Sequence, residues 1–229
     1  MTDASPAFGA LPGFLTPLAE RARRGEALVR RDTDPRDPAR GPGAVRRSAV
    51  LLLVTGTSLE EAHVVLEERG HAMRSQPGQF SLPGGGSDPG DRDDVHTALR
   101  EAEEETGLDP RHVQVAGAFA PIPMPWRVQR VTPVLGWAPA PLPLAAADPI
   151  EVERVVWAPL VGPGSLTDPT HRRRGLLRGQ GVGPVFELPE DAFVWGFTAM
   201  ILEQMLVGLG LDPVSPVSPT REIPPERRR

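Results

Sequence analysis

Three glutamates lie close together in one short stretch of the chain, at Glu101, Glu104 and Glu105. In a helix, successive residues are about 100° apart, so these carboxylates share a sector roughly 100° wide. Carboxylates so close repel one another, and a hard divalent cation that prefers oxygen ligands removes the repulsion. The spacing therefore indicates a Mg²⁺ or Mn²⁺ site with Glu101, Glu104 and Glu105 as ligands. The alternative is a solvated acidic helix face, which is what most glutamate runs are.

A glycine-rich turn made of Gly84, Gly85 and Gly86 comes shortly before the three glutamates. Glycine has no Cβ, so a backbone of this kind can approach a phosphate or a metal ion closely. The turn favours the metal interpretation over the solvated helix face. It also predicts that Gly84, Gly85 and Gly86 contact the substrate.

The sequence predicts a helix that would hold the glutamates in these positions. Apolar residues recur with the spacing of one buried helix face, at Val95, Ala98, Leu99 and Ala102. Asp91 or Asp93 can accept hydrogen bonds from the free amide groups of the first turn. Gly107 can adopt the left-handed conformation just past the last turn. Glu103 points away from the acidic sector, so we expect it to be exposed to solvent.

Residues 100–108, REAEEETGL, resemble the second half of the Nudix box, R-E-U-x-E-E-x-G-U, in which U is an apolar residue. The first half of the box matches less well. Counted back from the arginine, its opening glycine falls on Gly86 and its first glutamate on Arg92. With Gly85 as the opening glycine, Asp91 takes the first acidic position and the loop is one residue longer. We prefer this second alignment because it keeps a carboxylate in place.

The segment before this box resembles the additional signature of Nudix coenzyme A pyrophosphatases. Two arginines, Arg69 and Arg74, and a glycine–glutamine pair precede the Pro-Gly-Gly turn. Leu82 stands in place of the phenylalanine of that signature, and Gln76 in place of a histidine. Guanidinium groups match the geometry of phosphates, so Arg69 and Arg74 are predicted to bind the substrate. The alternative is that both are surface or salt-bridge arginines.

Two later segments extend the resemblance to residues 46–205. VTPV at residues 131–134 resembles a strand of the same subfamily, and VWGFTA at residues 194–199 resembles its C-terminal helix. Within that helix we expect Trp195 and Phe197 to pack in the core rather than to stack on a substrate.

The resemblance implies an enzyme that uses Mg²⁺ or Mn²⁺ to hydrolyse a diphosphate linkage in a small molecule. For this subfamily the substrate is coenzyme A or a derivative, and the products are 4′-phosphopantetheine and adenosine 3′,5′-bisphosphate. The matching residues of the box would be catalytic: Arg100, Glu101, Glu104 and Glu105. Arg100 would orient a glutamate through an ion pair. Nudix folds often draw a further carboxylate from a later segment, for which Glu151 or Glu153 is a candidate; an exposed strand position is the alternative.

Two other functions stay open. One is a Nudix enzyme that acts on another diphosphate, such as a nucleotide sugar, a dinucleoside polyphosphate or a nucleoside triphosphate. The other is a non-catalytic Nudix-fold protein that binds a nucleotide as a sensor, which the departure from the box at Arg92 allows. The clustered carboxylates favour an enzyme, because a protein that only binds nucleotides has no need of them.

Length and composition narrow the classes of protein to which this chain can belong. The 229 residues suit one domain with appendages, or two small domains. The chain has no cysteine and therefore no disulfide framework, and its five histidines show no ligand spacing that would indicate zinc. The net charge of −5 argues against general binding of nucleic acid. Because it lacks a membrane-length apolar run and a signal-peptide layout, we expect a cytoplasmic protein that does not enter the membrane.

Four regions are predicted along the chain. Residues 1–31 form an N-terminal helical extension, and its helix over residues 8–30 could serve as a homodimer interface or as a lid. Residues 32–45 are a linker rich in Pro, Asp and Arg. Residues 46–211 form the Nudix-like domain, and residues 212–229 form a disordered tail of Pro, Ser and Arg.

The rest of the pattern is one of strands with a few helices. The predicted strands cover residues 48–54, 62–66, 112–121, 128–137, 151–157 and 185–188. The first two are expected to form a hairpin. A helix is predicted over residues 191–209, and residues 161–183 are predicted to be mobile. The fold class is therefore α+β, an α/β/α sandwich with a mixed β-sheet and flanking helices.

Overall fold

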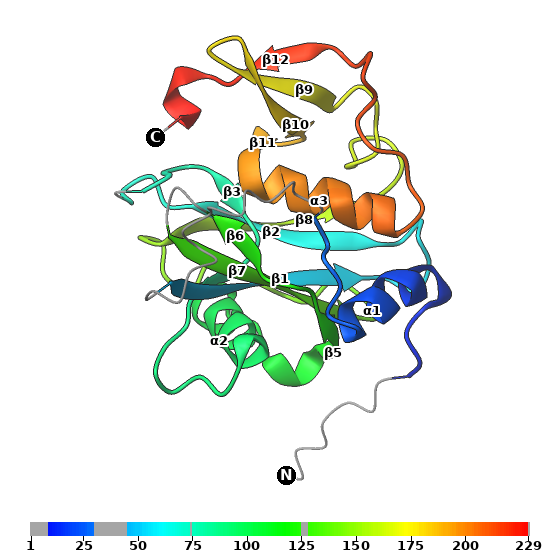
Figure 1. Cartoon of the computed structure of the whole chain (residues 1–229), viewed down its shortest axis with the longest axis vertical. Helices are drawn as coiled ribbons and strands as arrows, with labels where there is room; N and C mark the ends of the chain where they lie inside the picture. The colour runs from blue at the N-terminus through cyan, green and yellow to red at the C-terminus, as the bar shows by residue number, and fades with distance from the viewer. Residues whose placement is uncertain (1–8, 30–44, 74, 125–127, 229) are drawn as a thin grey trace.

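The computed structural model of this chain describes residues 9–29, 45–73, 75–124 and 128–228. Arg74 and almost all of the predicted linker lie outside these ranges. The described residues form a sheet of eight strands and a smaller sheet of four strands, with helices packed around them (Figure 1). None of the helices in the described ranges is long and apolar enough to cross a membrane.

The eight-stranded sheet is mixed, and β1 lies near its centre. Its strands are β1 (Arg46–Thr55), β2 (His63–Arg69), β3 (Phe80–Ser81), β4 (Gly84–Gly86), β5 (Gln114–Ala118), β6 (Ile122–Met124), β7 (Gln129–Ala138) and β8 (Val152–Pro159). β1 runs parallel to β7, whereas β2 and β4 pair with β1 in the antiparallel direction. The predicted hairpin of β1 and β2 is confirmed, with Val54 opposite Val64.

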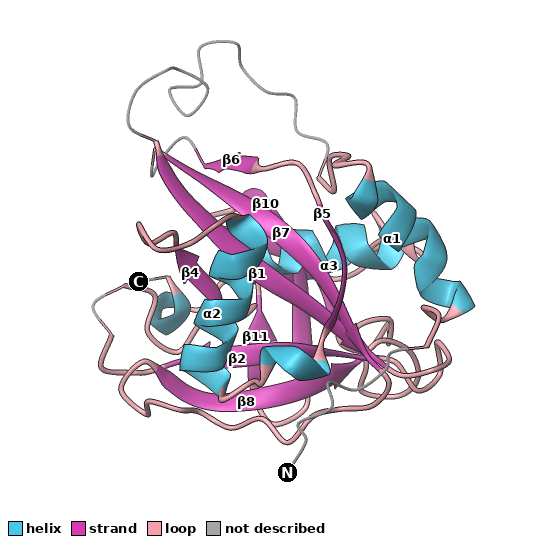
Figure 2. Cartoon of the chain, turned by 90° about the horizontal axis from the view of Figure 1, so that it is seen from below, coloured by secondary structure: helices cyan, strands magenta, loops and turns pink. Residues whose placement is uncertain are grey.

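β1 is apolar along most of its length because helices cover both of its faces. The α-helices are α1 (Thr16–Arg23), α2 (Asp94–Thr106) and α3 (Gly196–Gly208). Ala49, Leu51 and Leu53 share a core with α2, whereas Leu52 and Val54 share one with α1 and α3. Figures 1 and 2 show α2 and α3 on opposite sides of the sheet. This is the predicted α/β/α arrangement, so the predicted fold class is confirmed.

The four-stranded sheet packs on the side of α3 that faces away from the main sheet (Figure 1). In sheet order its strands are β11 (Ala192–Val194), β10 (Gln180–Leu188), β9 (Arg172–Leu177) and β12 (Thr220–Glu222). The prediction of a mobile segment over residues 161–183 is wrong, because β9 and β10 form a hairpin there. The hairpin turns at Arg178 and Gly179, whose φ values of 53° and 75° match the twist of the paired strands.

The helix predicted over residues 191–209 begins later than expected. Residues 192–194 form β11 and pair with β10, so α3 starts only at Gly196. The sequence pattern did not separate the two elements because both are apolar, and a short apolar run is compatible with a strand or a helix.

The prediction of a disordered tail over residues 212–229 is also wrong. β12 pairs in parallel with β9, and Ile223 is fully buried in a small cluster with Val185 and Phe193. One apolar side chain and the free edge of β9 therefore order a segment whose Pro, Ser and Arg content is typical of disorder.

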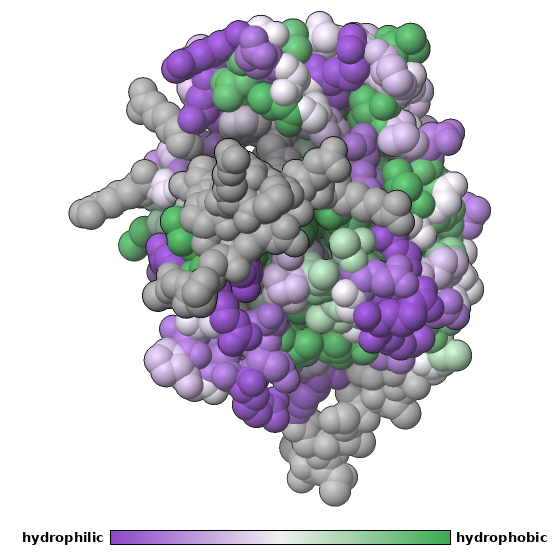
Figure 3. Space-filling view, viewed as in Figure 1, coloured by the Kyte–Doolittle hydropathy of each residue, from purple (hydrophilic) through white to green (hydrophobic). Residues whose placement is uncertain are grey.

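α1 packs into the same core as β5 and α3. Leu18 and Ala19 are fully buried. A Cβ on Gly117 of β5 would lie 2.6 Å from the backbone nitrogen of Arg23, so this close contact requires glycine. Hydrophilic side chains cover the outward side of α1 (Figure 3). The N-terminal helix is thus shorter than the predicted residues 8–30, and it contributes to the main core.

Candidate active site

α2 holds the acidic residues, and its ends lie where the sequence predicts. Of the two candidate caps, Asp93 accepts a hydrogen bond from the His96 amide at 2.8 Å. Gly107 has a φ of 68°, the left-handed conformation that ends many helices. Ala98 and Ala102 are fully buried against the main sheet. Both ends and the apolar face of α2 therefore fix the position of its acidic face.

Arg100 is joined to Asp91 by two hydrogen bonds, from Nε to Oδ1 and from Nη2 to Oδ2, each 3.0 Å long. The Asp91 side chain is only 3% exposed. The Arg100 guanidinium holds the pKa of this carboxyl well below its usual range. Arg92, the residue at the first acidic position in the other alignment, is exposed. The contact agrees with the alignment that opens the box at Gly85.

Arg100 also contacts two of the three predicted metal ligands. Its Nη2 donates to Glu101 Oε1 at 3.0 Å, and its Nη1 donates to Glu104 Oε2 at 2.9 Å. Nη2 further donates to the Gly86 carbonyl at 2.9 Å, which joins α2 to β4. The Glu104 side chain is 58% exposed and lies on the outer side of this network. Glu103 is exposed, as predicted.

Glu105 and Glu101 lie against the glycines of β4. Glu105 is buried and accepts a hydrogen bond from the Gly84 amide at 2.7 Å. The carboxylate of Glu101 occupies the space beside Gly85, where a Cβ would lie 2.3 Å from its Oε2. Burial raises the pKa of Glu105 to about 9, with Glu67 as the second cause, and burial also raises the pKa of Glu101.

Glu67 of β2 is a fourth carboxylate at this place, and sequence reasoning missed it. It is 1% exposed, and its Oε1 accepts a hydrogen bond from the Ser81 hydroxyl at 3.0 Å. Its Oε2 is buried and has no hydrogen-bond partner. Burial raises its pKa to about 7. The signal in the sequence was alternation along β2, because Val65, two residues earlier, faces the core under α2.

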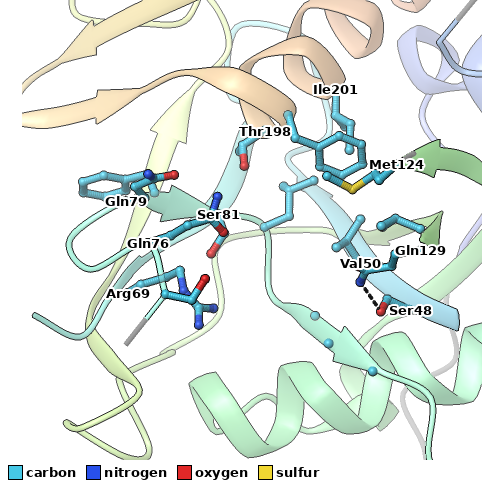
Figure 4. Close-up of a pocket in the computed structure, with 18 of the residues that line it drawn as sticks. Ser48, Val50, Arg69, Gln76, Gln79, Ser81, Met124, Gln129, Thr198 and Ile201 are labelled. Atoms are coloured by element: carbon cyan, nitrogen blue, oxygen red, sulfur yellow. Dashed lines mark hydrogen bonds between the residues drawn. The ribbon is translucent and has the colours of Figure 1, made fainter. Parts of the chain in front are cut away.

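A cavity of about 550 Å³ opens on the other side of the β4 glycines (Figure 4). Its lining includes all three predicted glycines, Gly84, Gly85 and Gly86. β1, β2, β6, β7, α3 and the segment around β3 contribute to the rest of the wall. Ser48 and Gln129, on the paired strands β1 and β7, lie on one side of it and are joined by a hydrogen bond of 2.6 Å.

Of the two predicted substrate-binding arginines, Arg69 lines this cavity and Arg74 lies outside the described residues. The Nε of Arg69 is buried and has no hydrogen-bond partner. Trp195 and Phe197 also line the cavity, although the sequence assigned them to packing alone. The indole Nε1 of Trp195 is likewise buried without a partner. Arg46, which the sequence did not single out, is a second arginine in the wall.

The two candidates for a further carboxylate from a later segment do not lie in the cavity wall. Glu151 immediately precedes β8 and Glu153 lies within it, and both are exposed. Both residues therefore fit the alternative prediction, which was an exposed position on this strand.

The acidic residues near β4 fit a hard divalent cation in their chemistry. Among the described residues, no three or more His, Cys, Asp or Glu side chains are arranged to hold a metal ion as they stand, and Glu104 contacts Arg100 instead. The available donors are carboxylate oxygens, which Mg²⁺ prefers. Glu67 has an unpartnered buried oxygen, and Glu67 and Glu105 have raised pKa values. Crowded carboxylates of this kind repel one another when ionised, and a divalent cation removes that repulsion.

Known proteins resemble this chain over the region that builds the site. Residues 45–169 match the NUDIX domain family. The uncharacterized Nudix hydrolase NudL of Photorhabdus laumondii is 35% identical over 171 residues, which are 75% of this chain and 89% of that relative. The NudL protein of Escherichia coli K12 is 33% identical over 168 residues, 73% of this chain and 85% of the relative.

A solved structure is similar over a shorter region. The Nudix hydrolase RenU of M. smegmatis is 26% identical, covers 49% of this chain and 70% of its own, and superposes with a TM-score of 0.41. Nudix hydrolases generally use divalent metal ions such as Mg²⁺ or Mn²⁺. Through its family match and its relatives, this chain belongs to the Nudix hydrolase family and is a pyrophosphohydrolase.

Proposed function

We propose that this Nudix enzyme hydrolyses the diphosphate linkage of coenzyme A or its derivatives, in a reaction that depends on Mg²⁺ or Mn²⁺. The products are 4′-phosphopantetheine and adenosine 3′,5′-bisphosphate. One observation carries the proposal: the three segments that resemble the coenzyme A pyrophosphatase signature, far apart in sequence, contribute to one cavity. Their contributions are Arg69 and Gln79, Val131, and Trp195 with Phe197.

The size and lining of the cavity support a substrate of this kind. Its volume of about 550 Å³ falls within the range of about 300–1,000 Å³ for small-molecule sites. Arg69 lies on one side of the cavity, and the apolar side chains of Met124 and Ile201 lie on another (Figure 4). Such a lining suits a molecule that has a charged diphosphate and a less polar arm, as coenzyme A does.

Glu101, Glu104 and Glu105 are the residues that would hold the divalent cation. When bound, such a cation neutralises charge on the diphosphate and lowers the pKa of a bound water. Glu101 and Glu105 already lie at β4. Glu104 contacts Arg100, so it would hold the cation with them only after exchanging this ion pair.

Other residues of the chain bind the substrate or orient the acidic side chains. Arg100 is a positioning residue, because it contacts Glu101 and Glu104 and holds the carbonyl of Gly86. The unpartnered Nε of Arg69 gains an acceptor when a phosphate oxygen enters the cavity. Water then attacks one phosphorus in line, and the other phosphate leaves.

A product-resolved assay with a panel of diphosphates tests the proposal. The panel contains coenzyme A, its oxidised form, acyl derivatives, nucleotide sugars, dinucleoside polyphosphates and nucleoside triphosphates, each with Mn²⁺. We expect the highest kcat/KM for coenzyme A or one of its derivatives. A higher kcat/KM for another member would move the substrate to that class. Nucleotide binding without turnover of any member would indicate a sensor.

A further inference from the structure

Glu67 is a fully buried carboxylate to which the proposed function gives no role. It lies on β2, opposite Ser81 of β3, and is 1% exposed. The Ser81 hydroxyl donates to its Oε1 at 3.0 Å, while its Oε2 is buried with no hydrogen-bond partner. Glu105 can share a hydrogen bond with Glu67 only when one of the two carboxyls is protonated, so the ionised pair calls for a cation.

The next residue along β2, Glu68, is a buried glutamate whose charge is neutralised by basic side chains. Glu68 is 5% exposed and points to the opposite face of the strand. Arg154 donates to it at 2.6 Å, and Arg227 and His71 lie 3.7 Å and 3.5 Å from it. Basic side chains of the fold therefore account for the burial of Glu68. The surroundings of Glu67 are different.

The neighbours of Glu67 are other carboxylates. Glu105 and Glu101 both lie close enough to interact with it electrostatically. Glu105 is itself buried and receives the Gly84 amide, and Glu101 lies beside Gly85. Arg69, two residues further along β2, acts on Glu67 and Glu105 only through its more distant charge. Three acidic side chains from β2 and α2 thus converge, and the direct ion pair that the described residues give them is that of Glu101 with Arg100 at 3.0 Å.

We propose that Glu67 is an additional ligand of the divalent cation in this enzyme, which it binds through Oε2 together with Glu101 and Glu105. The inference rests on the proposed metal-dependent function and extends its ligand set beyond α2. Ser81 holds one oxygen of Glu67 and leaves the other free, which is how outer contacts orient a metal-binding carboxylate. Oxygen-only ligands of this kind suit Mg²⁺ and Mn²⁺.

Two substitutions on the same strand test this role in the full chain. Glu67→Gln keeps the size of the side chain and removes its charge, and Glu68→Gln is the matched control. The readouts are the Kd for Mn²⁺ alone, from electron paramagnetic resonance, and the Tm with and without Mg²⁺. We expect E67Q to weaken Mn²⁺ binding by about tenfold or more. We also expect it to raise the metal-free Tm and shrink the rise that Mg²⁺ produces.

The control should behave in the opposite way. E68Q should lower the Tm with and without Mg²⁺, because it leaves Arg154 with a weaker partner, and it should keep the wild-type Kd for Mn²⁺. Ser81→Ala is a second probe that does not change charge. This variant removes the hydrogen bond that orients the Glu67 carboxylate, so it should weaken Mn²⁺ binding, but less than E67Q does. If E67Q fails to fold, the Mn²⁺ affinity of S81A tests whether Glu67 binds the cation.

The outcomes separate this inference from the proposed function. Wild-type affinity for Mn²⁺ and a wild-type Mg²⁺ shift in E67Q would overturn the role of Glu67 and reduce it to a partner of Ser81. A wild-type protein that binds Mn²⁺ but does not cleave coenzyme A would overturn the substrate alone. A wild-type protein that binds no Mn²⁺ would overturn both.

Discussion

Arg100 binds Asp91 through two parallel hydrogen bonds, each 3.0 Å long. The pair joins the loop after β4 to α2, and the same guanidinium then contacts Glu101 and Glu104. The position of two acidic side chains therefore depends on a carboxylate that does not itself lie at the β4 glycines. Asp91 has this role although the loop of the motif is one residue longer than in the usual Nudix box.

The first prediction concerns this pair. Arg100→Lys removes the paired geometry, because a lysine cannot donate two parallel hydrogen bonds to one carboxylate. We expect kcat to fall about 10²-fold, as for a catalytic group displaced by about 1 Å. Steady-state kinetics at saturating Mg²⁺ measures the loss. Arg92→Ala is the control, since Arg92 is exposed, and it should keep the wild-type kcat. Equal losses in both variants would contradict the assignment.

The second prediction uses the space beside Gly85. A Cβ at this position would lie 2.3 Å from Glu101 Oε2, the movable end of a side chain. Gly85→Ala should therefore fold normally and displace the Glu101 carboxylate. We expect the Tm to change by no more than about 4 °C and kcat to fall about 10²-fold. Full activity in this variant would show that Glu101 does not act from this position.

Two neighbouring glycines provide the comparison for this variant. Gly84 has a φ of 153°, and a Cβ there would lie 2.3 Å from the backbone oxygen of Ala49. Gly84→Ala should therefore lower the free energy of unfolding by about 2 kcal/mol or more, measured by urea denaturation. Gly90 has open space around it, so Gly90→Ala should keep both stability and activity.

The third prediction is a pH-dependent stability of the metal-free protein. Burial raises the pKa of Glu67 to about 7 and that of Glu105 to about 9, from an ordinary value of 4.5. The folded state then binds more protons than the unfolded state, so the free energy of unfolding falls as pH rises. The Tm in the presence of a chelator should decrease from about pH 4.5 to about pH 9.

Added Mg²⁺ and the Glu105→Gln variant should each reduce this dependence. The cation replaces the protons on the carboxylates, and glutamine removes the more strongly shifted group. Circular dichroism melts across the pH range measure the slope. A metal-free Tm that stays constant or rises through this range would show that the two carboxylates are not held in the protonated form.

The fourth prediction concerns the C-terminal segment. Gln79 Nε2 donates to the Arg227 carbonyl at 3.0 Å, and the Arg227 guanidinium contacts the Gly78 carbonyl. The 3₁₀ helix at Pro225–Arg227 therefore supports the turn that brings Gln79 to the cavity. Arg227→Ala should raise KM for coenzyme A several-fold and leave kcat close to wild type.

Arg228→Ala is the matched control for this segment. Arg228 contacts the Ile223 carbonyl and Glu222, within the tail itself. We expect its KM to stay near the wild-type value. If both variants raise KM equally, the tail acts through general stability rather than through the turn at Gln79.

Local signals in the sequence were sufficient for α2 and for β1. Three signals for α2 can each be recognised from a few adjacent residues. They are the apolar spacing of Ala98 and Ala102, the cap at Asp93 and the left-handed glycine at Gly107. β1 was recognised from its continuous apolar run, which is typical of a strand covered on both faces. The predicted ligands Glu101 and Glu105 lie near the predicted glycines because the helix and the turn adjoin in sequence.

Features that depend on distant contacts could not be predicted in this way. Glu67 meets Glu105 only when β2 and α2 pack together. Alternation along β2 places Glu67 on the same face as Val65, but nothing near it in the sequence shows that α2 covers this face. The order of the tail depends on Ile223 reaching a cluster formed by β10 and β11. The spacing in the sequence predicts that Glu104 faces the other two glutamates. In the structure it contacts Arg100 instead and lies on the exposed side of that arginine's network.

The proposed function depends on carboxylates of α2 that lie beside the β4 glycines and support metal-dependent cleavage of a diphosphate. The most direct test compares the products formed from coenzyme A by the wild-type enzyme and by Glu105→Gln at saturating Mg²⁺. We expect equal amounts of 4′-phosphopantetheine and adenosine 3′,5′-bisphosphate from the wild type, and a rate lower by orders of magnitude from a folded variant. An undiminished rate in Glu105→Gln would contradict this expectation.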